Sequence, residues 1–385
     1  MARNLTLLTD LYKLTMMQGY FKCKDANETV IFDMFYRNNP DGNGFAVCAG
    51  LEQVVDMIAN LHFSDEDIEY LRSLNIFEED FLEYLHEFKF TGSVYAIEEG
   101  RVMFEREPVV KVIAPIMQAQ LIETALLNII NHQSLIATKA YRIVHAARPD
   151  GVMEFGLRRA QGPDAGIYGA RAAMIAGCVA TSNVLCGQMF DVPVAGTHAH
   201  SWIMSFKDEL TAFRTYAEMY PDACILLVDT YDTLKSGIPN AIKVFNEMKQ
   251  KGIKSKKYGI RMDSGDLAYL SKKAKKMLDE AGFTDAVISA SNDLDEDLIM
   301  SLKLQGATIN SWGVGTNLIT SKNQPSFGGV YKLSAIFDKE TGKWIPKIKK
   351  SENTEKITNP GNKSIKRIYD KETGKLIADL ICLEH

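Results

Sequence analysis

The middle of the chain alternates between short apolar runs and amphipathic segments. CILLVD (224–229) and YGIRM (258–262) have the length of strands, while FKDELTAFRTYAEMY (206–220) and LAYLSKKAKKMLDEAG (267–282) repeat apolar residues at helical spacing. Strands that alternate with helices indicate a parallel sheet, and the number of such units in succession favours an irregular α/β barrel over an open sheet. The two ends of the chain instead mix acidic-capped helices with β-rich runs, and DKETGK occurs twice, at 338 and 370, where we expect two hairpin turns.

Composition narrows the class of protein. The 385 residues, 46% apolar and 24% charged, are those of a soluble globular chain with one large and one smaller domain. A net charge of -5 argues against a general nucleic-acid surface. No apolar stretch approaches the ~18 residues that span a bilayer, and the N-terminus lacks the apolar core of a signal peptide, so we expect a cytoplasmic protein. Six scattered cysteines without a C-x-x-C pair predict reduced thiols.

The segment GTHAHS (196–201) places His198 and His200 two residues apart. In an extended strand both rings would face the same side, but a zinc site needs further ligands that no Cys or His cluster supplies. A buried structural histidine is the plain alternative. An acid at the end of a neighbouring strand, such as Asp229 or Asp263, would favour chemistry instead, because it can hold one ring nitrogen and leave the other as a nucleophile or base.

Other predicted strand ends carry groups suited to anions and sugars. In RMDSGD (261–266), Arg261 suits a phosphate, while the carboxylates suit sugar hydroxyls or Mg²⁺. Phe155 beside Arg158 suits a flat anionic ring. Two turns resemble phosphate cradles, and their residues are Ser291, Asn292, Gly313, Gly315 and Thr316. Helix caps, ligand-free glycine turns and solvated arginines are the alternatives, and sequence alone favours an N-cap and a packed ring for Asp10 and Tyr12.

Taken in order, these motifs resemble those of nicotinate phosphoribosyltransferase. The motifs are EFGLRR (154–159), TSN (181–183), GTHAHS, VDTYD (228–232), RMDSGD, SNDLDE (291–296) and GVGT (313–316). The resemblance extends from LLTDLYKLTM at residue 7 and FYRNNP at 35 to KITNPGNKSIKR at 356–367, nearly the whole chain. It implies an irregular α/β barrel from residues 131–330 and a smaller α/β domain, similar to an open-faced sandwich, from residues 1–130 and 331–385.

The resemblance also implies a reaction and a set of roles. Nicotinate and phosphoribosyl pyrophosphate would give nicotinate mononucleotide and pyrophosphate, with Mg²⁺ and with ATP as co-substrate in NAD biosynthesis. His200 would be the phosphorylated histidine, Asp229 the acid that orients it, and Asp263 would hold the ribose end with Arg261. Tyr12, with Asp10, would come from the partner subunit of a homodimer. The remaining assignments are Phe155 and Tyr12 around the pyridine, Arg158 near nicotinate and pyrophosphate, Ser182 and Asn183 beside the nicotinate carboxylate, Ser291, Asn292, Gly313, Gly315 and Thr316 at the 5′-phosphate, and Arg37 and Lys139 as pyrophosphate contacts.

Three alternatives stay open. Nicotinamide phosphoribosyltransferase shares the fold, but there an acid suits the carboxamide, whereas Ser182 and Asn183 here place no like charge against a carboxylate. Quinolinate phosphoribosyltransferase would need a richer Arg/Lys lining and no phosphorylated histidine. A non-catalytic barrel that binds a phosphorylated ligand would have no reason to keep His200, Asp229 and Asp263 together.

Overall fold

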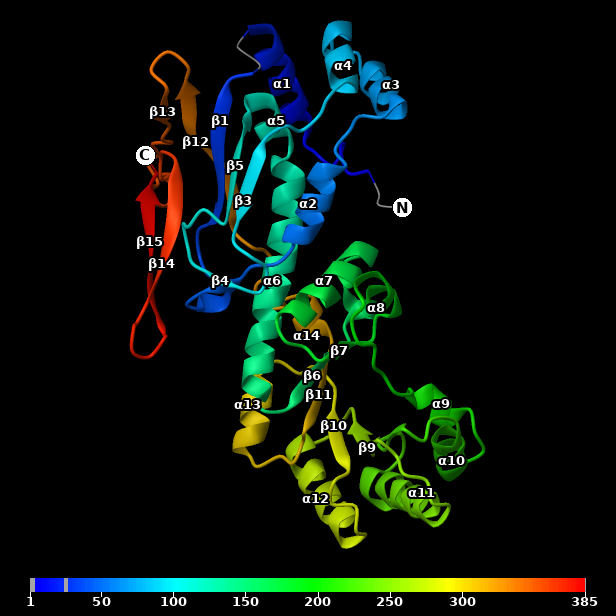
Figure 1. The fold of residues 1–385 in the computed structure, drawn as a ribbon. Helices are drawn as coiled ribbons and strands as arrows, with labels where there is room; N and C mark the ends of the chain where they lie inside the picture. Colours follow the sequence, from blue (N-terminus) through cyan, green and yellow to red (C-terminus); the bar gives the residue numbers. More distant parts are fainter. Residues whose placement is uncertain (1–3, 24–26, 385) are drawn as a thin grey trace. The chain divides into compact units, whose positions relative to one another are not determined.

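The computed structural model describes residues 4–23 and 27–384. The chain divides into two compact units, Met1–Leu135 with Ser326–His385 and Ile136–Pro325 (Figure 1). The long helix α6 (Glu123–Ala147) begins in the first unit and ends in the second. Within the described residues, no helix combines the length and apolar character needed to cross a membrane.

The first unit is built on a five-stranded antiparallel sheet. Its order is β13 (Lys343–Pro346), β12 (Gly329–Asp338), β1 (Thr29–Tyr36), β5 (Val110–Pro115) and β3 (Ser93–Ala96). The unit also contains α1 (Leu11–Cys23), α2 (Leu51–Ala59), α3 (Asp65–Ser73), α4 (Glu79–His86) and α5 (Ile116–Leu121). Two antiparallel two-stranded sheets complete the unit: β2 (Ala46–Val47) pairs with β4 (Val102–Met103), and β14 (Lys363–Tyr369) pairs with β15 (Leu376–Leu383).

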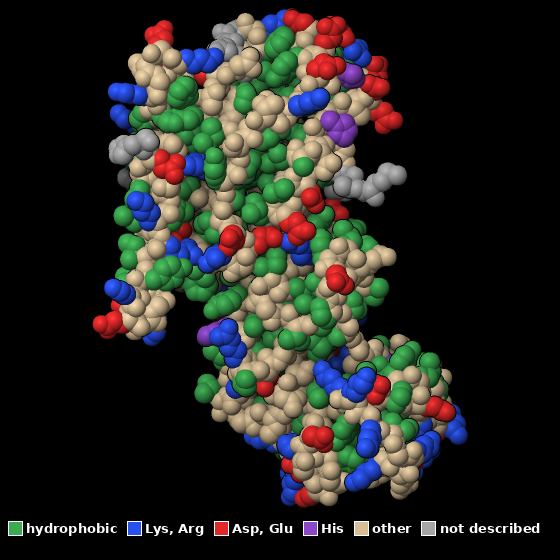
Figure 2. All heavy atoms as spheres, viewed as in Figure 1, with side chains coloured by type: hydrophobic (Ala, Val, Ile, Leu, Met, Phe, Trp, Pro, Cys, Tyr) green, Lys and Arg blue, Asp and Glu red, His purple; other side chains and the backbone are tan. Residues whose placement is uncertain are grey.

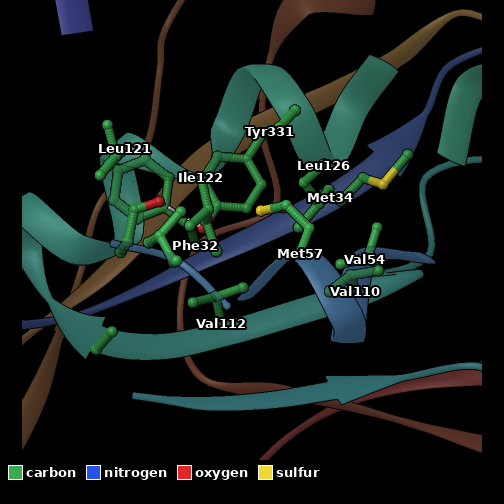
Figure 3. Close-up of a cluster of buried hydrophobic side chains, with 14 of the residues drawn as sticks. Phe32, Met34, Val54, Met57, Val110, Val112, Leu121, Ile122, Leu126 and Tyr331 are labelled. Carbon is green, nitrogen blue, oxygen red and sulfur yellow. Dashed lines mark hydrogen bonds between the residues drawn. The ribbon is translucent and has the colours of Figure 1, made fainter. Parts of the chain in front are cut away.

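The core of this unit joins both ends of the chain. Tyr331 of β12 stacks on Phe32 of β1 with ring centroids 4.8 Å apart, among the apolar side chains that Figure 3 shows. The Tyr331 hydroxyl donates to the carbonyl of Ala119, 2.9 Å away, so its polar atom is satisfied although the ring is buried. Burial of such a ring is one way in which residues after 326 stabilise a sheet begun near residue 29.

Both DKETGK segments form hairpin turns, as predicted. The first joins β12 to β13 and the second joins β14 to β15, each across an antiparallel pair. Asp338 and Asp370 accept hydrogen bonds from the hydroxyls of Thr341 and Thr373, respectively. The same local chemistry therefore makes the same turn twice, without a domain repeat.

The second unit contains a six-stranded parallel sheet that curls into a half-barrel. Its order is β7 (Ala180–Thr181), β6 (Gly151–Glu154), β11 (Ser311–Val314), β10 (Val287–Ala290), β9 (Lys257–Met262) and β8 (Ala223–Leu227). The helices that follow these strands along the chain include α7 (Pro163–Ile175), α8 (Val184–Phe190), α9 (His200–Met204), α10 (Glu209–Met219), α11 (Ile238–Gln250), α12 (Leu267–Glu280), α13 (Glu296–Leu304) and α14 (Thr316–Ile319).

The parallel α/β architecture is confirmed, but a complete barrel is not present in the described part of the chain. Strands β7 and β8 are the two edges of the sheet and do not pair with each other. The chain between them runs through three helices and adds only one isolated bridge, between Thr181 and Val194. The sheet therefore stays open on the side where GTHAHS leads into α9.

Acidic and basic side chains are interspersed on the face that Figure 2 shows. This mixture fits a net charge of -5 and differs from the single-sign surface typical of nucleic-acid binding.

Candidate active site

The carboxyl ends of four parallel strands, β6, β9, β10 and β11, supply the lining of a cavity of about 260 Å³. Parallel register places Met153 beside Gly313 and Ser289 beside Arg261, so the residues that follow each strand meet at one edge. Most of the predicted anion- and sugar-binding residues lie here. The lining consists of Phe155, Arg158, Arg159, Arg261, Asp263, Ser291, Asn292, Asp293, Gly313, Gly315 and Thr316.

Gly313 makes room for the Phe155 ring. A Cβ built on Gly313 would lie 2.7 Å from Cδ2 of Phe155, closer than side-chain carbons approach one another. Gly315 similarly lies close to the Phe155 carbonyl: a Cβ built on Gly315 would be 3.3 Å from that oxygen. The two glycines of the predicted phosphate-binding turn therefore also leave space for Phe155, the ring predicted to stack on the pyridine.

Asp229 holds the turn that carries Asp263, and Ser291 holds the Asp263 carboxylate itself. The backbone N–H of Asp263 donates to Oδ2 of Asp229 at 2.7 Å, and the Ser264 hydroxyl donates to the same oxygen at 2.7 Å. The Ser291 hydroxyl donates to Oδ1 of Asp263. Oδ2 of Asp263 lies 3.8 Å from Nε2 of His200. Asp263 is therefore an acid close enough to influence the predicted reactive histidine.

His200 begins α9, and its side chain is 40% exposed. Its Nδ1 lies 3.1 Å from the hydroxyl oxygen of Thr230. With Nδ1–H donating to Thr230, Nε2 carries the lone pair and points toward Asp263. The expectation that Asp229 orients His200 is not met in this geometry, because Asp229 instead binds the turn that carries Asp263 and Ser264. Thr230 lies between Asp229 and Asp232 in VDTYD, and a threonine in such a segment carries no pattern that predicts a contact with His200.

His198 has a different environment, although it is only two residues away. Only 8% of its surface is exposed, and its ring packs edge-on against Tyr216 with centroids 4.6 Å apart. The backbone N–H of Leu227 donates to its Nε2 at 3.4 Å. Burial, and then the positive charge of Arg261, lower the His198 pKa to about 4. His198 is therefore a neutral buried residue, and its Nε2 is used by the fold.

We expect acid to destabilise the protein through His198. Its pKa is 6.5 when unfolded and about 4 when folded, so the neutral ring stabilises the fold fully above pH 6.5, and this contribution is lost as the pH falls toward 4. Unfolding free energies measured at pH 7 and pH 4.5 should fall roughly 2–3 kcal/mol further for the wild type than for His198→Gln. Equal losses in the two proteins would show that His198 does not titrate in this way.

Arg261 lines both the cavity of about 260 Å³ and a second one of about 230 Å³. The guanidinium donates to the Thr197 hydroxyl at 2.6 Å and to the His198 carbonyl at 3.2 Å. Its Nε is buried without a partner among the described residues, and burial lowers the Arg261 pKa. Phe155 also lines both cavities. A flat ring beside Phe155 would thus lie next to a cation that is only partly paired.

Two predicted contacts are used by the fold itself. The Asn183 side chain accepts from the Cys186 N–H at 3.1 Å and donates to the Gly166 carbonyl at 3.1 Å, so this buried amide caps α8. Lys139 lies in the interior of α6, and its Nζ donates to Oε1 of Glu296 at 2.9 Å. A buried, ion-paired lysine does not suit the pyrophosphate contact predicted for it. Ser182 stays partly exposed.

The predicted residues Asp10, Tyr12 and Arg37 belong to the first compact unit. Tyr12 is 51% exposed, so the packed ring expected from sequence alone is wrong. The Asp10 carboxylate accepts a hydrogen bond from the Thr124 hydroxyl at 2.8 Å. Arg37 has a buried Nε without a partner in the described residues.

The half-barrel and its carboxyl edge define the class of protein. Arginines, a held carboxylate and two glycine or serine turns at the carboxyl ends of parallel strands are the arrangement by which α/β enzymes bind phosphorylated ligands.

Comparison with known proteins gives the family. The profile of the nicotinate phosphoribosyltransferase (NAPRTase) N-terminal domain matches residues 7–131, and that of the nicotinate phosphoribosyltransferase family matches residues 151–382. Nicotinate phosphoribosyltransferase of Bacillus subtilis is 52% identical over 364 residues, 94% of this chain and 73% of the relative. The human enzyme is 33% identical over 93% of this chain and 76% of its own length. The crystal structure of human nicotinic acid phosphoribosyltransferase matches with a TM-score of 0.83 at 30% identity, over 97% of this chain and 81% of that one.

The chain belongs to the nicotinate phosphoribosyltransferase family. Its activity is that of an enzyme of NAD biosynthesis whose substrates are nicotinate and phosphoribosyl pyrophosphate. The resemblance predicted from the motifs is confirmed.

Proposed function

We propose that this enzyme couples nicotinate mononucleotide formation to ATP hydrolysis through phosphorylation of His200. The observation that carries the proposal is the environment of the ring: Nδ1 lies 3.1 Å from the Thr230 hydroxyl, the side chain is 40% exposed, and Nε2 lies 3.8 Å from an Asp263 oxygen. In the coupling step Nε2 attacks the γ-phosphorus of ATP, the phosphorus–oxygen bond to ADP breaks, and ADP leaves. Water later hydrolyses the phosphohistidine to inorganic phosphate and restores the ring.

The phosphorylated ring would change the charge of the site. A phosphoryl group on Nε2 adds negative charge beside Asp263, which favours a substrate that brings its own cation. Mg²⁺ is held in proteins by one or two carboxylates together with substrate phosphates. The oxygen donors fit such an ion, because Oδ1 of Asp229 is buried without a hydrogen-bond partner in the described residues and Asp263 lines the cavity. Among the described residues no cluster of three His, Cys, Asp or Glu side chains could hold a metal without substrate. When bound, Mg²⁺ would neutralise the charge on the departing pyrophosphate.

The remaining residues would position the two substrates. Phe155 would stack on the pyridine, with Arg158 near the nicotinate and pyrophosphate and Arg261 with Asp263 at the ribose end. The turns at Ser291–Asn292 and Gly313–Thr316 would bind the 5′-phosphate. Asp263 would stabilise the positive charge that develops on the ribose as pyrophosphate leaves. The proposal rests on the shared cavity that these residues line.

We further infer a homodimer in which Tyr12, together with Asp10, completes the site of the partner subunit. A half-exposed tyrosine beside Lys13, whose Nζ lies 4.6 Å from the ring centroid, leaves an aromatic face for a ligand. Arg37 would contact pyrophosphate, since its Nε lacks a partner among the described residues.

Purified enzyme offered nicotinate and nicotinamide separately, with and without Mg-ATP, should form mononucleotide from nicotinate, and ATP should raise the yield. The physical reason is that Ser182 places no negative charge against a carboxylate. A preference for nicotinamide would overturn the role proposed for Ser182 beside the nicotinate carboxylate. Turnover of nicotinate unaffected by ATP would instead leave the transfer reaction intact and remove the coupling.

A further inference from the structure

The loop between β10 and α13, residues 291–295, has a backbone that its sequence does not favour. Asn292 and Asp293 have φ angles of 96° and 36°, in the left-handed region, and neither is a glycine. Two successive residues of this kind persist only where neighbouring groups hold them. Both residues, together with Ser291, line the active-site cavity of about 260 Å³. The loop therefore needs restraint from outside itself to keep its shape beside a ligand.

Asn317 supplies a restraint at the middle of the loop. Its side chain lies on α14, directly after the turn formed by residues 313–316, and is only 3% exposed. Nδ2 donates to the carbonyl of Asp293 at 2.7 Å and to that of Leu294 at 3.1 Å. Both amide protons are thus used on one loop, whereas Oδ1 has no partner among the described residues.

The ends of the loop are held independently. At its start the Ser291 hydroxyl donates to Asp263, and at its end Asp295 caps α13 by accepting from the Leu298 N–H. Glu296, the first residue of α13, is buried, accepts a hydrogen bond from Lys139 at 2.9 Å and forms an ion pair with Arg142 at 3.0 Å. These contacts fix where the loop leaves the sheet and enters the helix. They do not fix the peptide planes that follow Asp293 and Leu294, and Asn317 binds the carbonyls of these two residues.

We propose that Asn317 is a positioning residue that holds the 291–295 loop in its phosphate-binding form and couples it to the 313–316 turn. A peptide unit is planar and trans, so fixing the carbonyls of Asp293 and Leu294 fixes the N–H groups of Leu294 and Asp295 on the opposite side. Since Asn317 follows Thr316 directly, one side chain sets the relative position of both turns. The inference rests on the proposed binding of the 5′-phosphate by these turns.

The substitution that tests the role is Asn317→Asp, which has the same shape. At pH 8 an ionised carboxylate would face two carbonyl oxygens, so KM for phosphoribosyl pyrophosphate should rise at least about tenfold relative to wild type, with KM for nicotinate unchanged. At pH 6 more of the carboxyl is protonated and its O–H donates again, so the ratio of variant to wild-type KM should fall. Asn317→Ala should raise the same KM without this recovery at low pH. If Asn317→Asp does not fold, Asn317→Ser, which keeps one donor, should give a KM between those of wild type and Asn317→Ala.

Two controls separate this role from the alternatives. Asn310 accepts from the Ile288 N–H at 3.0 Å, ahead of β11 and away from both turns, so Asn310→Ala should lower the melting temperature without changing either KM. Asn317 variants that behave in the same way as Asn310→Ala would reduce Asn317 to a structural role and overturn the proposal. Thr316→Ala tests the phosphate-binding turns themselves. If it leaves KM for phosphoribosyl pyrophosphate unchanged, the proposed function of the turns fails and the inference fails with it, whereas a raised KM for Thr316→Ala alone rejects only the role of Asn317.

Discussion

Replacing His200 with alanine should abolish the effect of ATP while leaving nicotinate transfer at the rate that the wild type reaches without ATP. The reason is that the phosphoryl group has no acceptor once Nε2 is gone, whereas Phe155, Arg261 and Asp263 keep their contacts for the transfer itself. Wild-type protein incubated with γ-labelled ATP should acquire label that acid releases, and His200→Ala should acquire none. Product formation and ATP hydrolysis measured in the same tube give the coupling ratio directly.

The neighbouring histidine provides the matched control for this experiment. His198→Gln keeps a neutral acceptor for the Leu227 N–H and lies in the interior, so it should keep full stimulation by ATP. Thr230→Val removes the partner of Nδ1 and should weaken the coupling without abolishing it, because the ring loses its orientation but not its nucleophile. Full stimulation in His200→Ala would reject the phosphohistidine.

Residues at strand ends were the most predictable part of the site. Phe155, Arg261, Asp263, Ser291 and Gly313 could be grouped from the chain alone, because parallel strands bring their carboxyl ends to one edge. The choice of His200 over His198 came from the family resemblance, and the structure supplies the physical distinction through burial and the contact with Tyr216.

Pairings between distant residues were not predictable. Lys139 on α6 has the same helical spacing whether it faces ligand or protein, and its partner Glu296 lies 157 residues away. Asn183 reads equally well as a ligand contact or a helix cap until Gly166 and Cys186 are seen around it. Thr230 and Asn317 carry no motif of their own. The open side of the half-barrel was missed because periodicity shows that strands alternate with helices but not whether the last strand returns to the first.

The second large effect is expected at Asp263. Asn in place of Asp263 keeps the shape and the hydrogen bond from the Ser291 hydroxyl but removes the negative charge, so kcat should fall roughly 100-fold with little change in KM for nicotinate. The sensitivity follows from how this charge is held: Ser291 binds one oxygen of the Asp263 carboxylate, and Asp229 binds the turn that carries it, so the charge is preorganised. A loss below about threefold would show that Asp263 does not stabilise the transition state.

Mixing subunits extends this test to the proposed dimer. Tyr12→Ala should lower activity by removing one face of the pyridine site, yet the site it damages would be the one that contains the partner's Asp263. Unfolding and refolding Asp263→Asn and Tyr12→Ala chains together should therefore restore activity to about a quarter of the wild-type value, since half of the dimers would be mixed and each would hold one intact site. If Tyr12 instead served its own subunit, every mixed dimer would carry two damaged sites. Activity would then stay at the average of the two variants, and the assignment of Tyr12 to the partner's site would be wrong.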